Sequence, residues 1–102
     1  MWGQRSEALS PLNSVRLDVF LKQSRLVKRR ALAKELCEDG AVCVNGRTAR
    51  AGREVTTGDR LSLRLWSRLL DLEIAHIPER PPSKEEARKL FRILSEKRVE
   101  EL

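Results

Sequence analysis

The chain has 102 residues, 21 of them basic and 15 acidic, and its formal net charge is +6 at pH 7. This length fits one compact domain and leaves no room within it for a second, catalytic domain. Its apolar runs are only a few residues long. A membrane-spanning helix needs about 20 such residues, and a signal peptide needs an apolar core, so we expect a cytoplasmic protein without membrane contact.

The start of the chain is predicted to form a tail and a first helix. Residues 1–13 show no hydrophobic period, and we expect them to be flexible. Ser14 is a preferred N-cap residue, and Leu17, Phe20 and Leu21 follow with the spacing of an apolar helix face. The sequence therefore predicts a helix that Ser14 caps.

A second helix is predicted over about 28–39. Leu32, Leu36 and Cys37 lie on one side of it at 100° per residue. Gly40 is placed to end this helix in the left-handed conformation that glycine tolerates. The connection to the first helix is short, so we expect the two helices to pack antiparallel and to bring their adjoining ends into one corner.

Alternating apolar residues predict three strands after the helices. Val42 and Val44 share one face, and the tight-turn dipeptide Asn45–Gly46 follows them. A second turn is expected at 57–59. The next two strands place an apolar residue inward at every second position, and these residues are Leu61, Leu63, Leu65, Leu70, Leu72 and Ile74.

A last helix is predicted after the prolines at positions 78, 81 and 82. Ser83 and Glu86 have the spacing of a capping box, and an apolar stripe follows: Ala87, Leu90, Phe91 and Leu94. The predicted fold is therefore α+β, with two N-terminal helices packed on a small, mainly antiparallel sheet and a C-terminal helix added. We expect a folded domain over 14–78, and a linker and helix over 79–102.

The positive charge is concentrated in one segment. Residues 16–34 hold seven basic residues and one acid, Asp18, and so account for the whole net charge. Four bases crowd the entrance of the second helix, where the positive end of the helix dipole disfavours cations. Helix N–H groups and guanidinium groups together suit a phosphate, which predicts a nucleic-acid contact. The candidate residues are Arg16, Arg25, Lys28, Arg29, Arg30 and Lys34.

The segment 16–61 resembles the S-four RNA-binding domain. In that family "RLD" opens the first helix, an Arg and an Ala lie on the second, and a Gly, "V-VNG" and "GD" follow. These features correspond here to Arg16-Leu17-Asp18, Arg30, Ala33, Gly40, Val42, Val44-Asn45-Gly46 and Gly58-Asp59. The "VKRR" run and the "KEEA" segment resemble more narrowly the RqcP-like family of bacterial ribosome-associated proteins and its heat-shock-protein relatives.

The resemblance implies a ribosome-associated quality-control factor. Such proteins bind obstructed large ribosomal subunits that carry peptidyl-tRNA, and they contact both the large-subunit ribosomal RNA and the tRNA. They support C-terminal alanine tailing of the stalled nascent chain with a NEMF-class tailing factor. The resemblance thus implies that 14–78 is an RNA-binding domain. The alternative is a structural or assembly-related ribosomal RNA-binding protein without a quality-control role.

The residues favour binding over catalysis. The sequence contains no nucleophile–base pair, P-loop or dinucleotide motif, and its single histidine, His76, is expected at the surface. Two cysteines and one histidine are too few for a metal site, which needs about four ligands. We therefore expect no enzyme activity, no metal, no cofactor and no small-molecule substrate.

Three features of the sequence each allow two interpretations. The basic run could be a solvated charged face instead of an RNA contact. Trp66 is either a stacking platform for a base or a residue that packs on a neighbouring segment such as the last helix. Cys37 and Cys43 are expected to be free thiols, with Cys37 facing inward and Cys43 outward, and a disulfide between them would contradict a cytoplasmic location.

Overall fold

The computed structural model describes residues 14–98 of the chain. It contains three helices in this range, α1 (Leu17–Gln23), α2 (Arg30–Glu38) and α3 (Lys84–Arg88). The strands of the same range are β1 (Ser14–Arg16), β2 (Val42–Val44), β3 (Arg47–Thr48), β4 (Glu54–Thr56), β5 (Arg60–Leu65), β6 (Arg68–Ile74) and β7 (Phe91–Arg98). The predicted tail at 1–13 lies outside the described residues.

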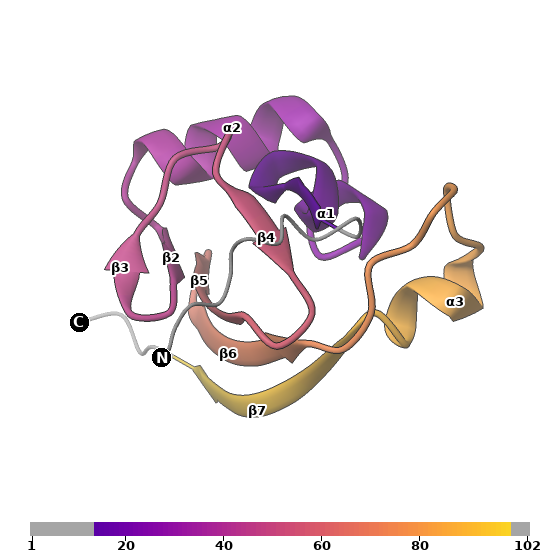
Figure 1. Ribbon diagram of the computed structural model, residues 1–102. Helices are drawn as coiled ribbons and strands as arrows, with labels where there is room; N and C mark the ends of the chain where they lie inside the picture. Colours follow the sequence, from indigo (N-terminus) through magenta and orange to yellow (C-terminus); the bar gives the residue numbers. More distant parts are fainter. Residues whose placement is uncertain (1–13, 99–102) are drawn as a thin grey trace, which may run out of the picture.

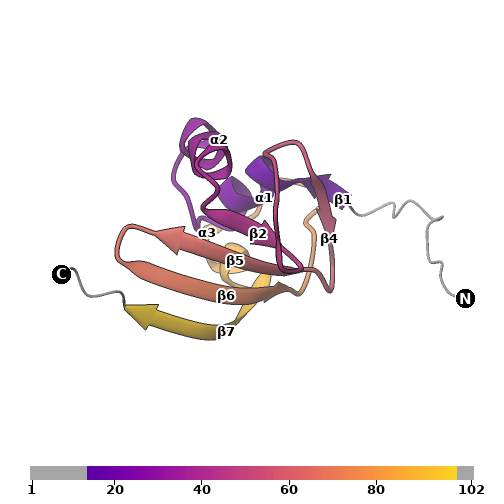
Figure 2. The ribbon, with the colours of Figure 1, turned by 90° about the vertical axis from the view of Figure 1, so that its left-hand side faces the viewer.

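A five-stranded sheet forms the base of the domain. Its strand order is β3-β2-β5-β6-β7, and every neighbouring pair is antiparallel. Helices α1 and α2 cover one side of this sheet, while β7 forms the edge farthest from them (Figures 1 and 2). Strands β1 and β4 form a separate antiparallel pair beside α1. The predicted α+β class and the packing of two N-terminal helices on an antiparallel sheet are confirmed.

The core lies between the two helices and the sheet, where the predicted alternation holds. The inward residues of β5 and β6 are buried, and the residues between them are half-buried or exposed. From the helices, Leu17, Phe20 and Leu21 reach the same core and are fully buried. At roughly 1.5–3 kcal/mol for each large apolar side chain, this burial is the main force that holds α1 and α2 on the sheet.

Two predicted helix and turn signals are confirmed by the backbone. Gly40, with a φ of 76°, follows the C-cap of α2 in the left-handed region, and Asn45 and Gly46 have φ values of 53° and 88° in the β2–β3 turn. Helix α2 begins at Arg30, two residues later than predicted.

Among residues 14–98, no helix is long and apolar enough to span a bilayer.

The predicted N-cap at Ser14 is wrong. Ser14 lies in β1 opposite Thr56, and its hydroxyl donates to Glu54 Oε1 at 2.9 Å. Helix α1 starts three residues later, and Arg16 occupies its N-cap position. The pairing of β1 with β4 takes Ser14 away from the helix, which is a tertiary contact that local capping rules do not contain.

The predicted C-terminal helix is also wrong beyond its first turn. The capping box of Ser83 and Glu86 is present, but α3 ends at Arg88. The carbonyl of Leu90 then accepts the N–H groups of Ala75 and His76, and residues 91–98 pair with β6 as the strand β7. This pairing satisfies the backbone groups along an edge of β6 that would otherwise stay open.

Candidate nucleic-acid interface

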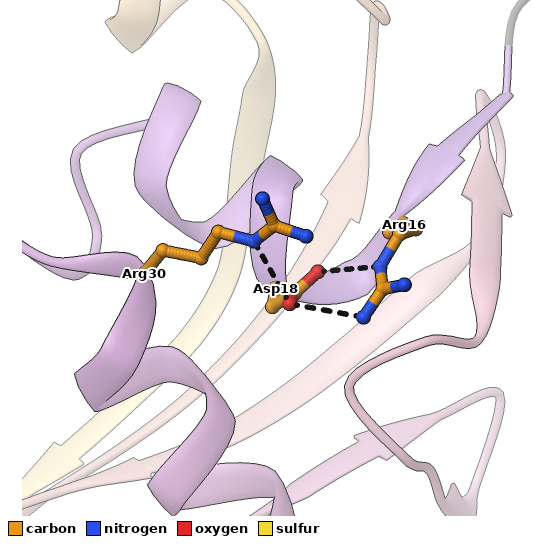
Figure 3. A network of polar contacts seen from close by, with 3 residues as sticks. All are labelled: Arg16, Asp18 and Arg30. Atoms are coloured by element: carbon orange, nitrogen blue, oxygen red, sulfur yellow. Dashed lines mark hydrogen bonds and ion pairs between the residues drawn. The ribbon is translucent and has the colours of Figure 1, made fainter.

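A buried carboxylate holds two arginines at the start of the helical layer (Figure 3). Arg16 donates from Nε to Asp18 Oδ1 at 3.2 Å and from a terminal nitrogen to Oδ2 at 3.3 Å. Arg30, from the first turn of α2, donates from Nε to the same Oδ2 at 3.1 Å. We call Arg16, Asp18 and Arg30 the Asp18 clamp. It joins the start of α1 to the start of α2 through a single acid.

The backbone fixes Asp18 before its side chain meets the arginines. The amide of Leu17 donates to the carbonyl of Arg53 at 2.7 Å, and the amide of Asp18 donates to that of Ala51 at 3.1 Å. The loop between β3 and β4 therefore supplies acceptors for the first N–H groups of α1, which have no partner within the helix. Because these amides are held, the carboxylate has a defined position between the two arginines.

The clamp keeps Asp18 ionised. Burial by itself raises the pKa of Asp18, but the hydrogen bonds and positive charges of Arg16 and Arg30 outweigh it and hold the pKa below its usual 3.8. The Asp18 side chain is 0% exposed, whereas each arginine side chain is 47% exposed. The acid thus lies underneath, and the guanidinium groups remain open to a ligand. In Figure 3 the dashed line from Arg30 starts at Nε, and neither of its terminal nitrogens carries one.

The entrance of α2 adds further donors. Its N-cap residue, Arg29, makes no side-chain capping bond, and its first turn contains no acid. The first N–H groups of a helix lack partners inside it and attract anions. Arg29 and Arg30 are both exposed at this entrance, so their positive charges lie beside the first amides of α2.

A cleft of about 690 Å³ extends the clamp along α2. Arg16 lines it together with Lys34 and Glu38 of α2, and the loop between β3 and β4 contributes Arg50 and Gly52. A Cβ atom at Gly52 would lie 3.7 Å from a terminal nitrogen of Arg16, so the guanidinium group packs over this glycine. Arg50 was not among the predicted residues, because its approach depends on how the loop folds back.

The remaining predicted residues form a second group. Arg25 and Lys28 line a separate cleft of about 450 Å³ together with Lys22 and the prolines Pro81 and Pro82. Arg25 has a φ of 64°, a left-handed conformation that costs most residues free energy and that glycine adopts freely. The conformation of the turn therefore gives no reason for an arginine at this position.

The predicted residues are thus divided between two neighbouring places. The structure brings Arg16, Arg30 and Lys34 to the clamp and its cleft, and Arg25 and Lys28 to the turn between the helices. The main feature that the sequence reasoning missed is the role of Asp18, which it named only as the acid of the basic segment and as part of the family motif. One signal for it was available, because Asp18 is the single acid among seven bases in 16–34.

Both cysteines are free thiols, and they differ in environment as predicted. Cys37 is buried on α2, whereas Cys43 is half-buried on β2. Burial, with smaller contributions from the negative charges of Asp18 and Glu38, raises the pKa of the Cys37 thiol to about 11. Within residues 14–98, no group of three His, Cys, Asp or Glu side chains could hold a metal ion.

Comparison with known proteins identifies the family. The family model that describes the S4 domain matches residues 15–61 of this chain. The RQC P-site tRNA stabilizing factor of Halalkalibacterium halodurans is 47% identical over 85 residues, covering 83% of this chain and 96% of that protein. The factor of the same name from Bacillus subtilis is 40% identical and covers 85% and 100%.

The fold agrees with this assignment. A structure described as trimeric heat shock protein 15 from Vibrio cholerae superposes with a TM-score of 0.75 at 32% identity, covering 80% of this chain and 83% of that one. The resemblance predicted from the segment 16–61 is therefore confirmed. This chain belongs to the family of RQC P-site tRNA stabilizing factors, and its S4 domain carries the Asp18 clamp.

Proposed function

We propose that this protein acts in ribosome-associated quality control by holding tRNA on an obstructed large ribosomal subunit. The names of its relatives support this role, since they are RQC P-site tRNA stabilizing factors. The observation that carries the mechanism is the Asp18 clamp, which presents two half-exposed guanidinium groups in fixed positions. Such preorganised forks suit RNA phosphates, which accept two parallel hydrogen bonds from arginine.

The RNA contacts in this proposal have two parts. Arg16, Arg30 and Lys34 bind phosphates at the clamp and along its cleft, while Arg25, Lys28 and Arg29 bind them around the turn between the helices. Phosphate contacts position a protein on RNA and dominate its affinity. Two neighbouring groups of cations suit two RNA segments, and we propose the peptidyl-tRNA and the large-subunit ribosomal RNA as these segments.

The protein acts here by binding and not by catalysis. It stabilises the tRNA while a NEMF-class tailing factor adds alanine to the C-terminus of the stalled chain in the cytoplasm. The partner and the tailing step rest on the family resemblance. The clamp contributes affinity and orientation, because its guanidinium groups lose little further freedom when a phosphate arrives.

The test is co-sedimentation with purified large subunits that carry peptidyl-tRNA, at two salt concentrations. Arg30→Ala and Arg16→Ala are compared with Arg88→Ala, which removes the same charge from an exposed residue of α3. We expect the clamp variants to bind at least tenfold more weakly and to lose roughly one unit of the log–log salt slope per lost contact. Arg88→Ala should bind like wild type.

Two outcomes oppose the proposal. Co-sedimentation of both clamp variants at wild-type levels would make the basic run a solvated face. Equal binding of the wild-type protein to empty subunits and to subunits with peptidyl-tRNA would favour a structural or assembly-related role. Circular dichroism of each variant separates lost binding from lost folding.

A further inference from the structure

Trp66 occupies a position that folding does not explain. It is the first residue of the two-residue turn between β5 and β6, and its φ of 53° lies in the left-handed region. Turns of this kind favour Gly or Asn there, and a bulky aromatic residue is unusual. The side chain is 80% exposed, so the ring gains little from burial and does not pack on a neighbouring segment. Strained, exposed residues of this kind point to a function.

The cleft around the ring combines two cations, two acids and apolar side chains. Arg64 lies opposite Leu69 in the β5–β6 register, and Leu69 lies opposite Lys97 of β7. These three residues line one cleft of about 620 Å³ together with Trp66. The two acids on the cleft are Asp39 and Asp71, and the Asp71 carboxylate accepts the Ser62 hydroxyl at 2.6 Å. An aromatic face flanked by Arg and Lys is the arrangement that binds unpaired bases with their phosphates.

We propose that Trp66 is a stacking platform for an unpaired RNA base, with Arg64 and Lys97 contacting the adjoining phosphates. This inference rests on the proposed RNA-binding function and names a second contact for it. The cleft of Trp66 meets the cleft of Arg16 and Lys34 at Gly40, which borders both. One continuous surface therefore runs from the Asp18 clamp to the β5–β6 turn, which lies at the end of the sheet away from β1 and β4 (Figure 2).

RNA fits this surface better than a protein partner does. Stacking on an exposed ring needs no deep apolar pocket, because every base offers a flat face. A protein hot spot instead places its anchor in a fully desolvated pocket, and this ring stands in an open cleft. The two cations of the cleft, Arg64 and Lys97, are placed to contact the phosphates on either side of a stacked base.

The test uses the fluorescence of Trp66 in the full chain. Trp2→Phe removes the other tryptophan, and the protein is titrated with a mixed-sequence 12-nucleotide single-stranded RNA and with the same sequence as a duplex. We expect single-stranded RNA to quench Trp66 and the duplex to quench it far less. Trp66→Gly removes the ring and relieves the left-handed backbone, so the variant folds, and it should bind single-stranded RNA roughly fivefold or more weakly. Trp66→Phe should recover most of this loss.

Each remaining outcome decides against the inference. If the protein binds the RNA but Trp66 is not quenched and Trp66→Gly binds like wild type, the stacking site is wrong and the proposed function stands. If Trp66→Gly loses affinity for large subunits and keeps its affinity for RNA, the ring contacts a protein. If neither RNA binds the wild-type chain at low salt, the proposed function fails together with the inference.

Discussion

Two basic regions of this protein differ in what lies beneath their cations. At the Asp18 clamp, a fully buried carboxylate holds two guanidinium groups. At the β5–β6 turn, Arg68 pairs with Glu96 at 2.8 Å, and both side chains are nearly half-exposed. A solvent-exposed pair contributes little, typically about 0.2–1 kcal/mol. A buried acid that receives several charge-assisted hydrogen bonds fixes its partners much more firmly.

The difference separates two ways of meeting RNA. The clamp sets the positions of Arg16 and Arg30 before the ligand arrives, so it suits a phosphate of defined position. The β5–β6 turn offers an exposed ring and cations on flexible stems, which suits a strand that adapts to it. If this comparison is right, substitutions beneath the two regions must have opposite consequences, even where they change the net charge equally.

The largest expected effect comes from Asp18→Asn, with Glu96→Gln as its matched control. Both substitutions remove one acid that pairs with an arginine, and both raise the net charge by one. Long-range attraction to RNA would therefore strengthen binding in both. We expect Asp18→Asn instead to weaken binding about tenfold and to destabilise the fold by about 1.5–3 kcal/mol, because the carboxylate receives charge-assisted hydrogen bonds from both arginines. Glu96→Gln should bind as wild type or slightly better.

Fluorescence anisotropy with the labelled single-stranded RNA measures the affinities, and urea unfolding measures the stabilities. If both variants bind RNA more tightly than wild type, the two regions do not differ in the proposed way. Asp18 would then act only as a negative charge that weakens the attraction to RNA. If only Glu96→Gln binds RNA more tightly than wild type, the result supports the difference between the clamp and the β5–β6 turn more strongly.

Acid pH provides the second test of the clamp. The folded-state pKa of Asp18 is lowered from 3.8, so its contribution to stability is complete above its unfolded pKa and is lost as the pH falls through the lowered folded value. The stability difference between wild type and Asp18→Asn should therefore be constant near neutral pH and shrink below about pH 4. Urea unfolding at several pH values measures this difference. A difference that does not change with pH would show that the carboxylate charge is not what holds the arginines.

These two predictions depend on a residue whose role local patterns did not reveal. The sequence predicted α1, α2, the alternation of β5 and β6 and the Asn45–Gly46 turn, because each follows from residues a few positions apart. It missed the bond between Asp18 and Arg30, which are 12 positions apart, and the approach of Arg50 to the clamp cleft. Such contacts depend on how complete elements pack.

The same reasoning explains why the helix predicted over residues 91–98 is a strand in the structure. Residues 91–98 combine a helical apolar spacing with good helix formers, yet they form β7 because β6 offers an open edge. Tertiary pairing overrides local propensity when it satisfies a whole row of backbone groups. The capping box at Ser83 remained valid because it acts within one turn of helix.

A smaller effect is expected at Arg25, which the clamp does not hold. Its φ of 64° suits glycine, so Arg25→Gly removes a cation and relieves backbone strain together. We expect the stability to stay within about 1 kcal/mol of wild type, while RNA binding weakens a few-fold and the salt slope falls by roughly one unit. Arg25→Lys keeps the charge and should keep most of the affinity. Unchanged affinity in Arg25→Gly would confine the RNA contact to the clamp.

The two cysteines report on the two regions separately. Cys37 lines the clamp cleft and Cys43 lines the Trp66 cleft. Because the Cys37 thiol is buried and its pKa is raised to about 11, iodoacetamide at pH 8 should modify Cys43 first in the folded protein. Saturating single-stranded RNA should slow this modification, as measured by mass spectrometry. A rate that RNA leaves unchanged would argue against occupation of the Trp66 cleft, and fewer than two reactive thiols in the unfolded, unreduced protein would indicate a disulfide.

The smallest effect is expected at Ser14, which lies two residues before Arg16 and takes no part in the clamp. Its hydroxyl donates to Glu54 across the β1–β4 pair at 2.9 Å, and this bond is exposed. Water replaces an exposed hydrogen bond readily, so Ser14→Ala should cost at most about 1 kcal/mol. The N-terminal amides of α1 keep their acceptors at Ala51 and Arg53, so Asp18 should stay in place and RNA affinity should not change. Urea unfolding and RNA anisotropy on the single variant decide this. A loss of affinity comparable with that of Asp18→Asn would mean that the β1–β4 pair, and not the buried acid, holds Arg16 in position.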